Sequence, residues 1–325
     1  MPAQLRRPAS ARRDRARATA LGLLAGVLLD QFAGDPRRGH PVALFGRAAG
    51  WLEARMWRDD RAAGTGYAVL LTVAPAALGL LARRLPAPWL AAATALGTWT
   101  VLGSRSLPAE AEAVAAHLRR GDLPAARRRL THLVGRRTDI LDEAEIARAT
   151  VESVAENTSD AVVAPLLWGA LAGLPGLLGY RAVNTLDAMV GHHSPRYENF
   201  GWASARADDL ANYLPARLTA ALAAVVAPVA GGRARRALAV ARADGRRHPS
   251  PNAGVAEAAF AGALGVRLGG RNDYGSHVED RPVLGGDGRP PELADIARAT
   301  RLSRAVTAAA AVAGAAIALS RGRGR

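Results

Sequence analysis

Residues 162–180 read VVAPLLWGALAGLPGLLGY, an uncharged run of 19 residues. A helix needs about 17–25 apolar residues to cross a bilayer, so this run is long enough to span one. Its middle holds the stretch Gly173–Gly176 (Gly-Leu-Pro-Gly), and proline breaks a helix while glycine permits a turn. The run therefore predicts either one membrane crossing or a segment that enters, turns and returns. We favour the second, because it keeps the polar residues on both sides of the run on one membrane face.

Five further apolar runs occur elsewhere in the chain, and all are rich in alanine and glycine. Small residues allow helices to pack closely within a bilayer. A soluble all-helical protein is the alternative, but so many apolar runs are difficult to bury in one soluble core. The sequence therefore predicts an all-α, polytopic membrane helix bundle of about four to six membrane segments, with amphipathic cytoplasmic helices and loops. The further runs are Thr19–Leu29, Tyr67–Ala82, Ala87–Gly103, Leu218–Gly232 and Ala305–Leu319.

The charged residues are unbalanced in number and narrow in kind. The chain has 43 Lys+Arg, all of them arginine, against 28 Asp+Glu, which gives a formal net charge of +15. Without lysine there is no Schiff-base or P-loop lysine, and without cysteine there is no disulfide, thiolate metal site or cysteine nucleophile. Aromatic residues make up 5% of the chain, which is thin for stacking on single-stranded nucleic acid. We therefore expect the lipid bilayer as a partner, and no nucleic acid.

The distribution of arginine predicts the orientation, because cytoplasmic loops carry an excess of positive residues. Most arginines between the apolar runs fall in residues 30–66, 104–161 and 233–304, so we expect these segments to face the cytoplasm from the cell (inner) membrane. The first run lacks a convincing cleavage site and is predicted to remain as an uncleaved helix. The predicted organisation is an Arg-rich leader at 1–18, a single membrane-embedded catalytic domain at 19–319 and a basic tail at 320–325.

A first cluster of polar side chains follows the first apolar run. Asp30 and Asp35 are carboxylates, which are common Mg²⁺ ligands. Arg37 and Arg38 carry guanidinium groups that can hold phosphate oxygens in pairs, and His40 adds an imidazole. Polar groups at the end of a membrane segment point to function by default. The alternative is a turn that ends the helix, with its charges in solvent.

A second cluster directly precedes the run at 162–180. Glu152, Glu156 and Asp160 are spaced i, i+4 and i+8, so a continuous helix would place three carboxylates on one face. Like charges in such a row repel each other unless a cation lies among them. The spacing therefore predicts a cation site, with Glu156 and Asp160 as the Mg²⁺ ligands, and a solvated helix face is the alternative.

The pattern Asn-Thr-x-Asp occurs twice, at Asn157–Asp160 and Asn184–Asp187. A continuous helix between the two copies would span about 40 Å and place them on opposite membrane faces. A bend in the intervening run would return them to the same face. Chance recurrence of so short a pattern is the alternative.

Two features near the C-terminal third complete the motifs. Arg246–Gly254 contains two prolines, and its Asn252 is expected to cap a short apolar helix over 253–266. The glycine-rich stretch 268–291 predicts turns or a small hairpin.

These motifs are most specific when taken together. They comprise Leu29-Asp30, Gly34-Asp35-Pro36-Arg37, His40-Pro41, Glu156-Asn157-Thr158-Ser159-Asp160, Val183-Asn184-Thr185-Leu186-Asp187 and Ser250-Pro251-Asn252-Ala253-Gly254. In this order and spacing the chain resembles the adenosylcobinamide-phosphate synthase family of cobalamin (vitamin B12) biosynthesis. The resemblance extends from about Leu21 to Arg304, whereas each motif alone is a weak signal.

The resemblance implies a multi-pass inner-membrane enzyme. Such a family joins (R)-1-amino-2-propanol, usually as its O-phosphate, to a side-chain carboxylate of adenosylcobyric acid, which gives adenosylcobinamide (phosphate). The corrinoid and the aminopropanol (phosphate) are then substrates, and other cobalamin-assembly enzymes are candidate partners. A carboxylate does not acylate an amine at neutral pH, because its oxygen is a poor leaving group, so we expect activation by ATP. The chain has no Walker A motif, so ATP and Mg²⁺ would bind through carboxylates and arginines.

Roles for single residues come from their chemistry, since the resemblance does not assign them. The predicted catalytic carboxylates, which would ligate metal or accept a proton from the amine, are Asp30, Asp35, Glu156, Asp160 and Asp187. The predicted substrate-binding residues are Arg37, Arg38 and His40 for phosphate charge, and Asn157, Asn184 and Asn252 for substrate amides.

Two functions from other classes remain as alternatives. One is a membrane Mg-dependent diphosphate (prenyl-type) transferase, which turnover of a prenyl donor would favour. The other is a non-catalytic corrinoid-handling membrane component, which tight corrinoid binding without turnover would favour.

Overall fold

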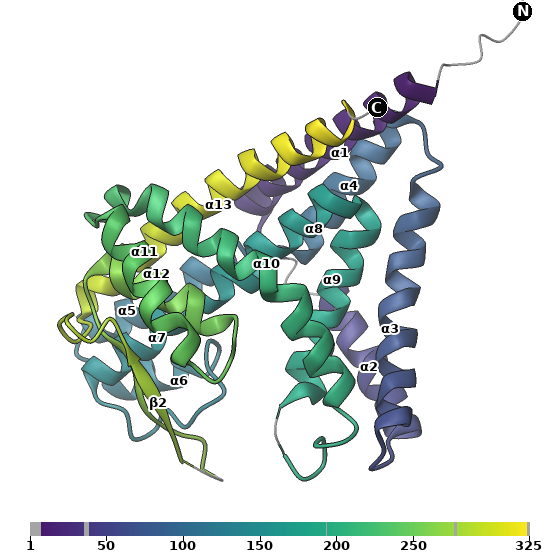
Figure 1. The fold of residues 1–325 in the computed structure, drawn as a ribbon. Coiled ribbons are helices and arrows are strands. Elements are labelled where there is room, and N and C mark those ends of the chain that lie inside the picture. Colours follow the sequence, from purple (N-terminus) through teal and green to yellow (C-terminus); the bar gives the residue numbers. More distant parts are fainter. Residues whose placement is uncertain (1–7, 36–38, 193, 276–277, 324–325) are drawn as a thin grey trace, which may run out of the picture. The chain divides into compact units, whose positions relative to one another are not determined.

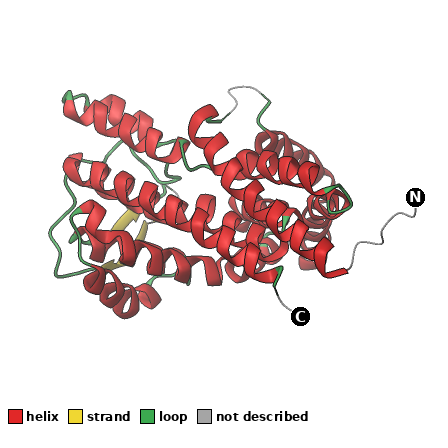
Figure 2. Ribbon diagram, turned by 90° about the horizontal axis from the view of Figure 1, so that it is seen from above, coloured by secondary structure: helices red, strands yellow, loops and turns green. Residues whose placement is uncertain are grey.

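The computed structural model describes residues 8–35, 39–192, 194–275 and 278–323, and helices dominate them (Figure 1). The chain divides into two compact units, each with more contacts within itself than with the other. Unit 1 comprises residues 1–102, 164–211 and 310–325, and unit 2 comprises residues 103–163 and 212–309. The described residues contain one small sheet of two strands (Figure 2). The predicted all-α fold class is confirmed.

Four of the described helices are long and apolar enough to cross a membrane, as the predicted polytopic bundle requires. They correspond to four of the six apolar runs, and each extends beyond the uncharged residues that define its run. These candidate spans are Ser10–Ala33, Arg61–Ala82, Trp202–Ala230 and Leu293–Arg321. The first begins well inside the Arg-rich segment 1–18.

Unit 1 contains the first two candidate spans and several shorter helices. Its complete helices are α1 (Pro8–Ala33), α2 (Pro41–Met56), α3 (Arg61–Ala82), α4 (Ala87–Val101), α8 (Ala164–Ala172), α9 (Leu174–Leu186) and the π-turn η2 (Asp187–Gly191). Two long helices, α10 (Trp202–Val226) and α13 (Leu293–Arg321), contribute residues to both units.

Helix α1 packs closely against α4 because small residues line its contact face. A Cβ atom at Gly22 would collide with Thr94, and one at Gly26 would collide with Thr98. Glycines four residues apart lie on the same helix face and let two backbones approach, as in other membrane helix pairs. The alanine- and glycine-rich composition therefore has the packing consequence that the sequence predicts.

The run at 162–180 bends as predicted. Helix α8 ends at Ala172, Gly173 takes a left-handed φ of 67°, and α9 begins at Leu174 with a proline in its first turn. Helices of 9 and 13 residues are about 14 and 20 Å long, too short to cross a hydrocarbon core of about 30 Å alone. Gly176 lets the second helix approach the Trp168 carbonyl.

Unit 2 holds shorter helices around one fully buried helix. Its elements are α5 (Ser106–Arg119), α6 (Leu123–Leu130), α7 (Glu143–Thr158), the π-turn η1 (Ser159–Val163), the 3₁₀ turns η3 (Ala227–Ala230) and η4 (Gly245–Arg247), α11 (Ala234–Asp244), α12 (Ala253–Leu264), β1 (Leu268–Asp273) and β2 (Val278–Leu284). Every residue of α12 is buried. The antiparallel pair β1–β2 confirms the hairpin predicted from the glycine-rich stretch.

The predicted cap of α12 is wrong in one respect. Asn252 occupies the N-cap position, but its side chain makes no cap bond because its backbone is already α-helical. Ser250 Oγ instead accepts the backbone N–H of Ala253 at 3.1 Å. The Asn252 side-chain oxygen accepts a hydrogen bond from Arg217 Nη1 at 2.7 Å.

Candidate functional site

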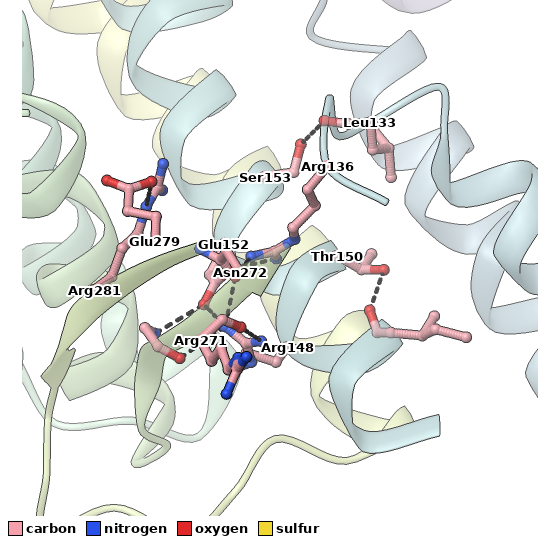
Figure 3. A network of polar contacts seen from close by, with 12 residues as sticks. Leu133, Arg136, Arg148, Thr150, Glu152, Ser153, Arg271, Asn272, Glu279 and Arg281 are labelled. Carbon is pink, nitrogen blue, oxygen red and sulfur yellow. Dashed lines mark hydrogen bonds and ion pairs between the residues drawn. The ribbon is translucent and has the colours of Figure 1, made fainter. Parts of the chain in front are cut away.

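A buried ion-pair network joins α7 to the β-hairpin in unit 2 (Figure 3). Glu152 on α7 accepts hydrogen bonds from Arg136 at 2.5 Å, Arg148 at 3.1 Å and the backbone N–H of Gly269 at 2.8 Å. Arg136 also donates to the side-chain oxygen of Asn272 on β1. Each buried charge therefore has a partner, which is the condition under which buried ions are tolerated.

The electrostatics of Glu152 follow from this geometry. Burial raises the pKa of its carboxyl, but the guanidinium groups of Arg136 and Arg148 outweigh burial and hold the pKa below its ordinary value. Glu152 is therefore ionised at neutral pH and acts as the anionic centre of the network.

A cavity of about 220 Å³ lies beside this network within unit 2. It is bounded by the turn after α6, by α7, by α12 and by the hairpin. Its polar lining combines carboxylates and guanidinium groups: Arg136, Glu152, Ser153, Glu156, Glu257, Tyr274 and Arg281. Glu156 is the predicted site residue found in this lining.

Glu257 is a site residue that sequence reasoning missed. It lies in α12, is 2% exposed and lines the cavity. Burial raises the pKa of its carboxyl well above the ordinary value, and the negative charges of Glu152 and Glu156 add to this. A signal was present, because Glu257 is the single charged residue within the apolar stretch 253–264, and a lone charge in an apolar run points to function.

The hairpin supplies the second guanidinium group of the cavity. Arg281 on β2 donates to Glu279 at 3.0 Å and to the Tyr274 hydroxyl at 2.8 Å. Burial raises the pKa of Tyr274, so the phenol stays protonated at neutral pH. These bonds fix the orientation of Arg281 before any ligand binds.

The other predicted residues of unit 2 have different surroundings. The Asn157 amide donates to the Ser153 carbonyl at 3.0 Å and is thus bonded within its own helix. Asp160 is half-buried in η1 and lies outside the cavity lining. The turn from α-helix to π-turn changes the angle per residue, so the continuous face of three carboxylates that the spacing predicted is interrupted after Glu156.

The first predicted cluster belongs to unit 1. Asp30 is fully buried near the end of α1, and its carbonyl accepts the backbone N–H of Gly34 at 2.9 Å. His40 Nδ1 caps α2 by accepting the N–H of Val42 at 3.2 Å, and its Nε2 lies 3.7 Å from an Asp35 carboxylate oxygen. Arg37 and Arg38 lie outside the described residues.

The second Asn-Thr-x-Asp copy also belongs to unit 1. Asn184 donates to an Asp208 carboxylate oxygen at 3.3 Å, which joins α9 to the start of α10. Asp187 is the first residue of η2. Its side-chain oxygen lies so close to Gly191 that a Cβ atom at that position would collide with it. Of the predicted carboxylates, Asp30, Asp35 and Asp187 are thus in unit 1, and Glu156 and Asp160 in unit 2.

Both copies of the pattern occur where an α-helix becomes a π-turn. In unit 2, α7 continues into Ser159–Val163, and in unit 1, α9 continues into Asp187–Gly191. The threonine hydroxyl of each copy bonds the carbonyl four residues earlier, at 2.6 Å for Thr158 and 2.7 Å for Thr185. This back-bonding bends helices, and π-turns are frequent at functional sites. The two copies of the Asn-Thr-x-Asp pattern therefore share a local structure as well as a sequence.

Within the described ranges, no group of three or more His, Asp or Glu side chains is placed to hold a metal ion. Mg²⁺ commonly binds proteins through one or two carboxylates together with water and substrate phosphates. The predicted pair Glu156 and Asp160 is compatible only with that mode, in which phosphate oxygens complete the coordination.

Comparison with known proteins gives consistent matches over most of the chain. A family model described as CobD/Cbib protein matches residues 23–303. The cobalamin biosynthesis protein CobD of Mycobacterium tuberculosis (strain ATCC 25618 / H37Rv) is 55% identical over 294 residues, which cover 90% of this chain and 94% of that protein. Proteins of the same name are 48% identical in Geobacter metallireducens, with 82% and 87% covered, and 46% identical in Rhodobacter capsulatus, with 82% and 86% covered. No solved structure matches the chain.

Proposed function

The chain belongs to the CobD/Cbib family of cobalamin biosynthesis proteins, and from this membership we propose that it is an amide-forming ligase. The proposed bond joins a side-chain carboxylate of adenosylcobyric acid to the nitrogen of (R)-1-amino-2-propanol or its O-phosphate. The product is adenosylcobinamide or its phosphate. Family membership supports the pathway, and the chemistry of the site supports the reaction.

The energetics of the bond require an activated carboxyl group. A carboxylate oxygen is a poor leaving group, so transfer of a phosphoryl group from ATP to that oxygen would make an acyl phosphate. The amine then displaces phosphate and leaves an amide. The absence of lysine from the chain excludes the usual P-loop contact to ATP phosphates, and arginines would take its place.

The observation that carries the proposal is the mixed-charge cavity of unit 2. An amine needs a carboxylate near its nitrogen, and a phosphoryl group needs fixed guanidinium groups near its oxygens. Glu156 and Glu257 offer the first, while Arg136 and Arg281 offer the second. Because both arginines are oriented by hydrogen-bonded partners, little reorganisation is needed during the reaction.

The remaining predicted residues keep the roles that their chemistry suggests. Mg²⁺ would neutralise the ATP phosphates, with Glu156 and Asp160 as its protein contacts. Asp30, Asp35 and Asp187 are further candidate carboxylates, and Arg37, Arg38, His40, Asn184 and Asn252 are candidate substrate contacts.

We further propose that the chain lies in the inner membrane with these motifs on the cytoplasmic side. Single-cysteine labelling tests this cleanly, because the native chain has no cysteine. Cysteines at Ser159 and Thr185, one beside each Asn-Thr-x-Asp copy, should react from the same, cytoplasmic side of sealed vesicles. Reaction from opposite sides would remove Asp187 from the proposed site.

The reaction itself is tested by omission. Membranes containing the chain receive adenosylcobyric acid, aminopropanol phosphate, Mg²⁺ and ATP, with each component left out in turn, and products are identified by mass spectrometry. We expect the amide only in the complete mixture. An amide formed equally without ATP would contradict the ligase, and turnover of a prenyl diphosphate would point to the alternative transferase.

A further inference from the structure

Glu257 differs from the other carboxylates of the cavity in its supporting structure. It is carried by α12, whose twelve residues are all buried, and its side chain reaches the cavity with 2% of the residue exposed. Most buried carboxylates in proteins are paired or hydrogen-bonded, because an isolated buried charge is strongly unfavourable. The surroundings of this carboxyl group therefore need an explanation.

Two other buried carboxylates of unit 2 show the usual solution. Glu152 accepts bonds from Arg136 and Arg148. Asp295 accepts bonds from Arg289 at 2.6 Å and Arg298 at 2.7 Å. In the part of the chain that the structure describes, the Glu257 carboxyl group makes no such bond or ion pair.

Charged and titratable groups face Glu257 from each neighbouring element. They are Glu152 and Glu156 on α7, Arg136 on the preceding turn and Arg281 on the hairpin. Tyr274 also lines the cavity, and His248 precedes α12 in the sequence. Burial lowers the pKa of His248, so its imidazole is neutral. The two guanidinium groups are already bonded, Arg136 to Glu152 and Arg281 to Glu279. Within the described residues, neither guanidinium group therefore holds the Glu257 carboxyl group.

The shape and charge of the cavity restrict what can occupy it. A free anion would lie beside the Glu156 and Glu257 carboxyl groups, while both guanidinium groups of the cavity are already bonded to other carboxylates. The described residues supply no group of three metal-binding side chains here, so a divalent cation would need phosphate oxygens and water to complete its coordination. Sites for drug-sized ligands measure about 300–1,000 Å³, so a cavity of about 220 Å³ is too small for a corrinoid. A small organic cation meets each of these restrictions.

We propose that this cavity is the binding subsite for the primary ammonium group of the amine substrate, with the Glu257 carboxylate accepting its hydrogen bond beside Glu156. The inference rests on the proposed function, since it identifies the place of the amine in that reaction. Burial in α12 holds the carboxylate rigidly, so the nitrogen is positioned rather than merely attracted. The positive charge also offsets the repulsion between the two glutamates.

Direct binding of the amine tests this inference separately from catalysis. Detergent-purified full-length protein is titrated with 1-amino-2-propanol, with its O-phosphate, and with 1,2-propanediol, which replaces the ammonium group by a neutral hydroxyl. The variants are Glu257→Gln, which removes the charge at nearly constant volume, and Glu143→Gln, a matched control at an exposed position on α7. Glu257→Asp tests rescue by a shorter carboxylate.

We expect Glu257→Gln to weaken binding of both amines at least tenfold, and Glu257→Asp to restore part of the affinity. The diol should bind weakly to every variant, and Glu143→Gln should match wild type. In turnover, KM for the amine should rise while KM for ATP and the corrinoid stays unchanged. Thermal unfolding of each variant shows whether it is folded. If Glu257→Gln does not fold, the amine affinities of Glu257→Asp and wild type are compared instead.

Each outcome separates the inference from the proposed function. Loss of amine binding in Glu257→Gln with no amide formed by wild type would support the subsite and contradict the ligase. Amide formation with unchanged amine binding in Glu257→Gln would overturn the subsite and leave the ligase. A changed Mg²⁺ requirement with unchanged amine KM would also overturn it, because the cavity would then serve a metal.

Discussion

The two units each contain a polar cavity, but the cavities hold their charges in different ways. In unit 2 the cavity of about 220 Å³ mixes carboxylates and guanidinium groups, of which Arg136, Glu152 and Glu257 are buried. In unit 1 a cavity of about 410 Å³ has four exposed arginines and no carboxylate in its described lining. The arginines are Arg12, Arg15, Arg83 and Arg321.

The difference shows which charges the fold depends on. Exposed arginines at helix ends are hydrated and favour anionic surroundings, so each contributes little to folding. A buried guanidinium and its carboxylate are each costly alone and tolerable together. The ion-pair network of unit 2 is therefore built by mutual neutralisation, and Glu257 is the buried carboxyl group to which the described residues give no ion pair.

The largest effect should come from removing a buried partner. Arg136→Met takes away one guanidinium from Glu152, and the free energy of unfolding should fall by about 3 kcal/mol, near the low end for a broken buried pair because Arg148 remains. Thermal or denaturant unfolding in detergent measures this. The double variant Arg136→Met with Glu152→Met should be more stable than Arg136→Met alone. Equal stability of the single variant and wild type would contradict the mutual-neutralisation account.

Removal of a predicted catalytic charge should affect turnover instead of folding. Asp160→Asn keeps the size of the side chain and removes its charge. If Asp160 contacts Mg²⁺ with the nucleotide, amide formation should fall at least about a hundredfold, or about 2.7 kcal/mol in activation free energy, in protein that is still inserted. Near-normal turnover would return Asp160 to a purely structural role at the π-turn.

The sequence predicts the framework better than the site. Apolar runs located all four candidate spans, and Gly173 with Pro175 located the bend, because length and helix-breaking residues act locally. The π-turns after Thr158 and Leu186 could not be predicted. Whether a single turn of helix is α or π depends on how that turn packs against neighbouring elements, which the local sequence does not specify. Glu257 was overlooked because its neighbours in the cavity, Glu156 and Arg281, come from distant segments of the chain.

Two of the three glutamates that line the unit 2 cavity, Glu152 and Glu257, should give opposite dependences of stability on pH. The folded-state pKa of Glu152 is lowered, so its contribution is complete above the unfolded glutamate pKa of about 4.3 and is lost as pH falls through the folded value. The pKa of Glu257 is raised, so stability is lost as pH rises from about 4.3 through its folded value. Glu257→Gln should remove this second loss, an effect on the order of 1 kcal/mol. If the free energies of unfolding of wild type and Glu257→Gln differ by the same amount at every pH, the raised pKa of Glu257 would be contradicted.

The smallest effect should come from the unit 1 cavity. Arg15→Met is the same chemical change as Arg136→Met, made at an exposed position. Its effect on unfolding should stay within about 0.5 kcal/mol, as for most surface substitutions, measured in the same detergent. If Arg15→Met lowered the free energy of unfolding as much as Arg136→Met, the proposed difference between the two cavities would be contradicted.

The central claim is that ATP activates the corrinoid carboxylate for attack by the amine. Adenosylcobyric acid labelled with ¹⁸O in its reacting carboxylate tests this most directly, with inorganic phosphate analysed by mass spectrometry after turnover. Phosphoryl transfer moves one carboxylate oxygen into the acyl phosphate, and attack by the amine releases it with phosphate. The account predicts one ¹⁸O in each phosphate released per amide formed. Amide formation with unlabelled phosphate would contradict an acyl phosphate intermediate.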